Sequence, residues 1–253
     1  MKAAPGVAFK DPLICRVFRR AYQHTPNLVA YRTMQAAIAL SIALSNQSRA
    51  TMKTILIANP KGGAGKTTLS TNLAGYLAHQ GEDVFLWDLD RQKSALHWLS
   101  QRSAHLPPIG RLDAAKDKTG AGWLILDSPA GLHGEKLSEL LKRVEKVIVP
   151  IVPSSFDLAA TRTFLSELSD EKSVRKGRAF VAIVGMRVDA RTRAAEKLDD
   201  FLMPVDLPVL THLRDTQNYV TAAFEGKSIF DMAPSQVAQD IEQWQPIIKW
   251  LRT

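Results

Sequence analysis

The feature that most constrains this chain is a glycine-rich segment, KGGAGKTT, at residues 61–68. It follows an apolar run at residues 54–58 and opens a stretch with helical spacing at residues 67–80, which is the context that a phosphate-binding loop requires. Glycines let the backbone curl so that several N–H groups point at one phosphate, and the helix N-terminus adds its positive end. The segment therefore predicts a phosphate site between a strand and a helix.

We expect this loop to bind ATP and Mg²⁺. Lys66 would bridge the β- and γ-phosphates, Thr67 would supply a hydroxyl to Mg²⁺, and Thr68 would meet the α-phosphate region. The predicted nucleotide-binding residues are Lys61, Gly62, Gly63, Ala64, Gly65, Lys66, Thr67 and Thr68. The alternative is a glycine-rich turn without a ligand, which is disfavoured because Gly, Lys and Thr all fall at the required spacing after a strand.

The apolar runs after residue 52 predict the fold. They are continuous rather than alternating, which suits strands of a parallel sheet covered on both faces. The candidate strands are 54–58, 84–87, 123–126, 147–152 and 180–184, and the candidate helices between and after them are 67–80, 134–143, 157–168 and 191–201. We expect a doubly wound α/β domain with a mainly parallel sheet and helices on both faces, as in P-loop NTPases.

Residues 1–51 differ from the remainder, residues 52–253, which we expect to form the ATPase domain. They carry seven of the 33 basic residues and one of the 25 acidic residues, so the remainder holds 26 basic and 24 acidic side chains. The extension is predicted to be a misassigned start or a poorly ordered tail. Its apolar run at 36–44 is too short to span a bilayer. The single cysteine, Cys15, excludes a disulfide framework and suits a reducing cytoplasm.

Lys61, directly before Gly62 and Gly63, resembles the extra lysine of the deviant Walker A motif, KGGxGKT, of the ParA/MinD family. The resemblance implies that Lys61 reaches across a dimer interface to the nucleotide of the opposite subunit, with Lys61, Lys66 and Asp90 as the catalytic residues. ATP would then hold a homodimer together. The alternative for Lys61 is a solvated loop charge.

Two carboxylate segments extend the resemblance. Residues 88–92, DLDRQ, are similar to the family's DxDPQ segment, with Arg91 in place of proline. By position, Asp90 would orient the attacking water and Asp88 would lie near the magnesium shell, whereas the alternative is that both aspartates cap the next helix. Asp127 ends an apolar strand as in a Walker B segment and would hold Mg²⁺ directly or through water. Gly131 could permit movement near the γ-phosphate.

Residues 149–158 and 210–230 resemble the short ParA partition proteins. This implies an ATP-bound dimer that binds DNA without sequence preference and is released when a ParB-like or other cargo adaptor stimulates hydrolysis. The protein would be cytoplasmic and nucleoid-associated, and its cargo would be a plasmid, a chromosome or a protein assembly. The predicted DNA contacts are Arg187, Arg191, Arg193, Lys197 and Arg214.

Alternatives remain open for these basic residues and for the function. Glu196 and Asp199 lie near Arg191 and Lys197, which equally indicates a solvated helix face, and Arg187 and Arg214 are also candidates for contacting adenine. A MinD-like regulator would bind membrane through a terminal amphipathic helix. At residues 237–251, however, the polar face is not strongly basic, so packing onto the domain is preferred. A third alternative is an ATP-dependent ligase of the dethiobiotin synthetase type.

Overall fold

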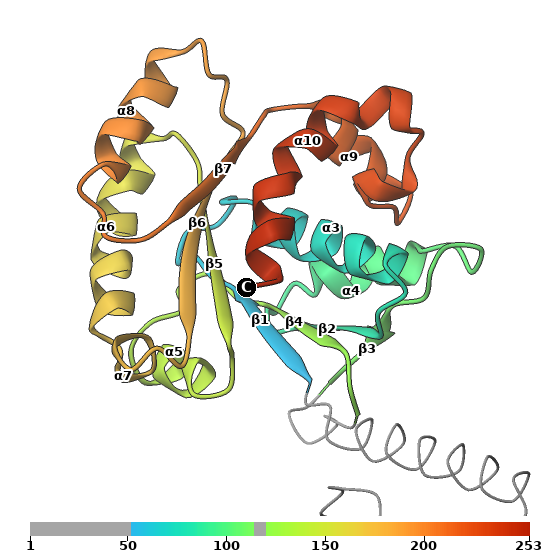
Figure 1. Ribbon diagram of the computed structural model, residues 1–253, viewed down its shortest axis with the longest axis horizontal. Helices are drawn as coiled ribbons and strands as arrows, with labels where there is room; N and C mark the ends of the chain where they lie inside the picture. Colours follow the sequence, from blue (N-terminus) through green and yellow to red (C-terminus); the bar gives the residue numbers. More distant parts are fainter. Residues whose placement is uncertain (1–51, 114–119) are drawn as a thin grey trace, which may run out of the picture. The chain divides into compact units, whose positions relative to one another are not determined.

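The computed structural model describes residues 52–113 and 120–253 (Figure 1). The predicted extension, residues 1–51, lies outside the described residues. In these described ranges, seven strands form one sheet in the order β3-β2-β4-β1-β5-β6-β7, and every neighbouring pair is parallel. The strands are β1 Lys53–Ile57, β2 Val84–Asp88, β3 Gly110–Arg111, β4 Trp123–Asp127, β5 Lys146–Ile151, β6 Phe180–Met186 and β7 Val209–Leu213. The predicted α/β class is confirmed, and the sheet is entirely parallel.

Helices cover both faces of the sheet (Figure 1). One face carries α3 Lys66–His79, α4 Ser94–Gln101, α9 Gln217–Phe224, the short 3₁₀ helix η2 Ile229–Asp231 and α10 Pro234–Leu251. The other face carries α5 Gly134–Leu141, α6 Ser155–Asp170, α7 Lys172–Arg175 and α8 Arg193–Leu202. This double covering explains why the strands are apolar along their whole length.

Alternation along β1 shows how one strand serves both cores. Ile55 and Ile57 pack with α3 and α10, whereas Leu56 packs with α5 and α6 on the opposite face. Because successive side chains of a strand point to opposite faces, each apolar residue of a covered strand is buried on one side or the other. The central helix α3 is buried along most of its length, which places the residues at its N-terminus on a rigid base.

The segments that follow the central strands β1 and β4 pass to opposite faces of the sheet. The chain after β1 enters α3 on one face and returns to β2, whereas the chain after β4 enters α5 on the other face and crosses to β5. In open α/β sheets, ligands bind at the carboxyl ends of strands where such a reversal occurs. The loops after β1 and β4 meet there, because the N–H of Gly131 donates to the carbonyl of Pro60 at 2.8 Å.

The sequence prediction missed several short elements. Strand β3 has two residues and β7 is a partly exposed edge strand, so neither produces a long apolar run. Helices α4 and α9 have eight residues each and were not predicted. The expectation that the last helix packs onto the domain is confirmed, because Trp244 of α10 is completely buried. Within the described residues, no helix is both long and apolar enough to cross a bilayer.

Candidate nucleotide-binding site

The phosphate loop is anchored to the neighbouring strand before it curls. Asn59 donates from Nδ2 to the carbonyl of Pro150 in β5 at 2.7 Å, and its Oδ1 accepts the N–H of Lys61 at 2.8 Å. Asn59 is 1% exposed, so these bonds are shielded from water. The loop therefore begins from a fixed point on the sheet, and its shape does not depend on the ligand alone.

Two glycines give the loop its curvature. Gly63 has φ of 73° and Gly65, the residue before α3, has φ of 93°, both in the region that side chains with a Cβ rarely adopt. At Gly65 a Cβ would also lie 2.8 Å from Cε of Met186. The loop thus needs glycine for its backbone conformation, and a Cβ at Gly65 would also require the Met186 side chain to shift.

Lys66 is held at the first turn of α3, with 8% of its surface exposed. Its ammonium donates to the carbonyl of Lys61 at 2.8 Å, and this bond uses one of its three donors. Burial lowers the pKa of Lys66, while the carboxylates of Asp127 and Asp90 oppose that shift. A partly desolvated cation at a helix N-terminus is well suited to phosphate oxygens.

Asp127, at the end of β4, joins the strand to the first turn of α3. Its Oδ2 accepts from the hydroxyl of Thr67 at 2.8 Å and its Oδ1 accepts from the hydroxyl of Ser70 at 3.0 Å. The carboxyl is almost fully buried, and burial raises its pKa to about 6. A hydroxyl beside an aspartate is the pair of protein ligands that holds Mg²⁺ in P-loop NTPases. These residues therefore fit the predicted cation, whose charge would favour the ionised form of Asp127.

Asp88 bonds the backbone at the start of α4, as expected in the helix-capping alternative. It is 1% exposed, and its Oδ2 accepts the N–H groups of Ala95 and Leu96 at the start of α4, at 2.9 and 3.2 Å. Its Oδ1 accepts the N–H of Asp90 at 3.0 Å. With both oxygens used by backbone donors, Asp88 is a helix cap and loop organiser. Asp88 also pairs in register with Asp127 across β2 and β4, so its expected place near the magnesium shell stays a prediction.

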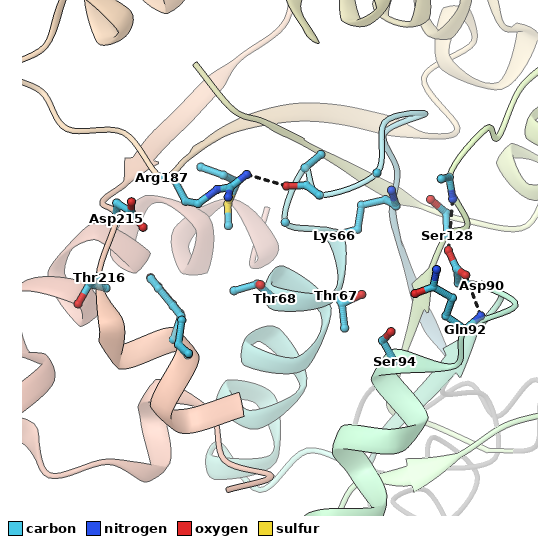
Figure 2. Close-up of a pocket in the computed structure, with 18 of the residues that line it drawn as sticks. Lys66, Thr67, Thr68, Asp90, Gln92, Ser94, Ser128, Arg187, Asp215 and Thr216 are labelled. Atoms are coloured by element: carbon cyan, nitrogen blue, oxygen red, sulfur yellow. Dashed lines mark hydrogen bonds between the residues drawn. The ribbon is translucent and has the colours of Figure 1, made fainter. Parts of the chain in front are cut away.

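Asp90 connects the loops that follow β2 and β4. Its Oδ1 accepts the N–H of Gln92 at 2.9 Å and its Oδ2 accepts the N–H of Ala130 at 3.3 Å. The turn is closed without the family's proline, because the N–H of Lys93 donates to the carbonyl of Asp90 at 3.3 Å while Arg91 stays exposed. Asp90 lines the pocket in front of the phosphate loop (Figure 2).

The pocket has a volume of about 480 Å³ and reaches from the phosphate loop to the carboxyl ends of β6 and β7. Its far wall contains Met186, Arg187, Arg214, Asp215, Thr216, Tyr219 and Val220. Figure 2 shows Asp215 and Thr216 across the pocket from Asp90, with Thr67 and Thr68 between them. This volume lies within the range of small-molecule sites. One end offers donors for phosphate, and the other offers mixed polar and apolar side chains.

The five predicted DNA contacts fall into two groups. Arg187 donates to the carbonyl of Gly63 at 2.8 Å, and Arg214 is ion-paired with Asp240, so both belong to the pocket wall. The other three, Arg191, Arg193 and Lys197, are exposed on or before α8. That helix also exposes the acidic residues Glu196, Asp199 and Asp200, and Arg191 pairs with Asp189. The structure therefore does not bring the five residues together into one basic surface.

Sequence reasoning missed three residues that shape the site: Ser70, Tyr219 and Asp240. Ser70 comes one helical turn after Lys66 and Thr67, a spacing that places it on the same side of the helix. Asp240 lies on the apolar face of the last helix, between Val237 and Trp244, and an acid at such a position indicates a buried partner. Tyr219 carries no comparable indication, because its role depends on contacts made by the folded chain.

Residues 55–229 match the family described as the CobQ/CobB/MinD/ParA nucleotide binding domain. The chain is 30% identical over 193 residues to maintenance of carboxysome distribution protein A of Halothiobacillus neapolitanus, covering 71% of this chain and 87% of that protein. It is 28% identical over 190 residues to the chromosome-partitioning ATPase Soj of Thermus thermophilus, covering 60% of this chain and 76% of that protein.

A solved structure supports the fold independently. The putative plasmid partition protein of Borrelia burgdorferi bound to AMPPNP superposes with a TM-score of 0.60 at 18% identity, covering 78% of this chain and 99% of that chain. The resemblance inferred from the phosphate loop is thus confirmed by the match over most of the chain. This protein belongs to the ParA/MinD/CbiA family of P-loop ATPases.

Proposed function

We propose that this chain is a ParA-type positioning ATPase, which dimerises with ATP and Mg²⁺, binds DNA without sequence preference and is released by partner-stimulated hydrolysis. The observation that carries the proposal is the position of Asp90, which lines the nucleotide pocket and bridges two loops beside the phosphate cradle. Two relatives, named for carboxysome distribution and chromosome partitioning, support a positioning role. The cargo would accordingly be a protein assembly, a plasmid or a chromosome.

Within this proposal, the chain's own groups divide the work of hydrolysis. Lys66 and the loop N–H groups bind the β- and γ-phosphates, and Thr67 with Asp127 holds the cation. Mg²⁺, when bound, would neutralise phosphate charge as the bond to the leaving group breaks. Asp90 accepts a hydrogen bond from the attacking water and aligns it with the γ-phosphate. Because Asp90 spans two loops, a displacement of either loop would change the hydrolysis rate.

Lys61 is the proposed link between subunits. Its backbone is fixed at both polar groups, since its N–H donates to Asn59 and its carbonyl accepts from Lys66. The side chain is half-buried at the front of the loop. We propose that in the ATP-bound dimer it contacts the phosphates of the opposite subunit, where a second cation offsets charge that one subunit leaves uncompensated.

DNA binding is proposed for the dimer rather than for the single chain. The exposed candidate contacts outside the pocket wall are Arg191, Arg193 and Lys197. Acidic neighbours on α8 reduce their field, so doubling the surface by dimerisation would be needed for useful affinity. An adaptor that stimulates hydrolysis would then reverse DNA binding by separating the subunits.

The MinD-like alternative receives less support. A membrane-binding terminal helix would need its apolar face free, whereas α10 buries Val237, Trp244, Ile247, Ile248 and Leu251 against the sheet. The ligase alternative shares the family and the loop, but it requires a second substrate beside the phosphates. Turnover that depends on a small carboxylic acid would favour it.

The test measures binding to two surfaces in three nucleotide states. A labelled duplex of random sequence and anionic liposomes would each be titrated with the full chain in ATP, ADP or no nucleotide, alongside light scattering for molecular mass. We expect dimers and DNA binding with ATP alone. Asp90→Asn should lose about 100-fold in hydrolysis and hold the dimer on DNA. Lys61→Ala should bind ATP but remain monomeric, and Lys136→Ala, an exposed lysine on α5, serves as its control.

Three outcomes would contradict the proposal. ATP-dependent binding to liposomes but not DNA would favour a membrane-cycling regulator. Turnover only in the presence of a carboxylic acid, without binding to either surface, would favour a ligase. Dimerisation of Lys61→Ala equal to that of the wild type would remove the lysine's role across the interface.

A further inference from the structure

We infer that Asp240, buried in the last helix, is a positioning residue that holds Arg214 against the nucleoside end of ATP. The inference rests on the proposed function insofar as ATP is the ligand of the pocket. It assigns a role to α10, which contributes no residue to the pocket lining. The ligand group concerned is a hydrogen-bond acceptor of the base or the ribose, and the phosphates are not involved.

The ion pair between these residues has two bonds. Nε of Arg214 donates to Oδ1 of Asp240 at 2.6 Å, and Nη2 donates to Oδ2 at 3.1 Å. Asp240 is fully buried, whereas about one third of the Arg214 side chain, 32%, remains exposed and lines the pocket. Asp240 therefore has a structural role, whereas Arg214 faces the ligand site.

The bidentate geometry fixes the direction of the guanidinium. An Arg side chain has a planar, rigid set of donors, so pairing through Nε and Nη2 leaves Nη1 on the other edge of the plane. Oδ2 of Asp240 also accepts from Nδ2 of Asn218 at 2.6 Å, which locks the carboxylate itself. Arg214 is therefore preorganised, and little rotamer entropy is lost when Nη1 meets a ligand acceptor.

Two further contacts tie α10 to the same wall. Gln243 accepts the N–H of Arg214 through Oε1 at 3.0 Å, and the indole N–H of Trp244 donates to the hydroxyl of Tyr219 at 2.9 Å. Tyr219 lines the pocket, and burial raises its pKa. Side chains on adjacent turns of α10 thus fix the segment between β7 and α9 from behind.

The segment that follows Arg214 lies on the side of the pocket away from Asp90. The residues that follow Arg214, Asp215 and Thr216, lie at the opposite end of the pocket from Asp90 (Figure 2). If the phosphates of ATP occupy the phosphate loop, we expect a group held there to contact the part of ATP beyond the phosphates. Loss of Asp240 should consequently weaken ATP binding without weakening the binding of a ligand made of phosphates alone.

The experiment compares ATP with inorganic tripolyphosphate, both with Mg²⁺, by calorimetry on the full chain. Asp240→Asn and Arg214→Gln should each weaken ATP about 10-fold, the loss expected for one hydrogen bond to a charged group. Their affinity for tripolyphosphate should stay within about twofold of the wild type. Glu242→Gln, at an exposed position two residues further along α10, is the matched control and should change neither affinity.

The double variant Asp240→Asn with Arg214→Gln makes the test independent of folding defects. It replaces a buried ion pair by a neutral amide pair and avoids leaving one charge alone. If Asp240 acts through Arg214, the double variant should lose about 10-fold in ATP affinity, as each single variant does, instead of about 100-fold.

Additive losses, or equal losses for ATP and tripolyphosphate, would overturn the inference. The proposed function fails separately: wild-type protein that binds tripolyphosphate as tightly as ATP would show that the pocket does not recognise a nucleoside at all.

Discussion

The two ends of the pocket are built in different ways. The phosphate end is formed by one short segment, residues 59–68, and Asp127, and most of its contacts join residues close in sequence or on adjoining strands. The other end, which we propose holds the nucleoside and call the nucleoside end, lies at the ends of β6 and β7, and its ion pair joins residues 214 and 240. The phosphate end is therefore a local motif supported by the sheet, whereas the nucleoside end is supported by the last helix.

The largest effect is expected from removing the Lys66 ammonium group at the phosphate end. Lys66→Ala should weaken ATP binding by about 1000-fold, because two charge-assisted hydrogen bonds to phosphate are lost. The melting temperature without nucleotide should not fall, since the variant also removes a desolvated ammonium whose pKa is lowered by burial. Calorimetry and thermal melts check both outcomes.

The matched control for this prediction is Lys136→Ala, which removes an exposed lysine from α5. If Lys66→Ala lost no more than twofold in ATP affinity, the phosphate end would not be the main source of binding energy, and the contrast between the two ends would be wrong.

An effect of intermediate size is expected in the pH dependence of folding stability, which we attribute to Asp127. Burial raises its pKa to about 6 in the folded chain, above the ordinary value of 3.8, so the folded state binds this proton more tightly than the unfolded state. Without Mg²⁺, stability should rise as pH falls from about 6 toward 4, by about 3 kcal/mol at most. Asp127→Asn should remove this dependence and be the more stable protein at pH 7. Urea unfolding at a series of pH values measures the difference.

The comparison with Thr211→Ala, a half-buried hydroxyl on β7, controls for general effects of polar substitution. A constant difference in unfolding free energy between wild type and Asp127→Asn across this pH range would show that the Asp127 carboxyl does not titrate as its burial requires.

The smallest effect is expected at Arg187, a residue of the pocket wall that also contacts the phosphate loop. Its φ of 54° is unusual for a residue other than glycine, and its side chain contacts Gly63. Arg187→Gly should relieve about 1 kcal/mol of backbone strain, while Arg187→Ala keeps that strain. Both should weaken ATP only about threefold, the loss of a single exposed contact. Thermal melts compare the stability of the two variants, and calorimetry compares their ATP affinity. Equal stability of Arg187→Gly and Arg187→Ala would show that the backbone at residue 187 is not strained.

The phosphate end could be predicted from the sequence because its chemistry is contained in neighbouring residues. The spacing of glycines, Lys66 and Thr67 after an apolar run was sufficient, and the continuous apolar runs were sufficient for the parallel sheet. Asp127 followed from its place at a strand end, and the structure supports that placement with bonds from Thr67 and Ser70.

The nucleoside end could not be predicted in the same way. Arg214 could be named by position, but its partner lies 26 residues further along the chain, and no local pattern pairs the two. For Asp88 the sequence left two roles open, because an aspartate after a strand can serve a metal or cap a helix. The bonds from the N–H groups of Ala95 and Leu96 depend on the turn after β2, which no local pattern predicts.

Helix α10 is also the last of these elements to be synthesised. A ribosome completes the phosphate loop and Asp127 long before it reaches Asp240, and domains fold as their segments emerge. A nascent chain that has reached residue 230 has its phosphate ligands, but Arg214 and Tyr219 still lack Asp240 and Trp244 behind them. If Asp240 acts as we propose, full ATP affinity is reached only after α10 has docked, and ATP then stabilises the finished domain more than a chain without α10.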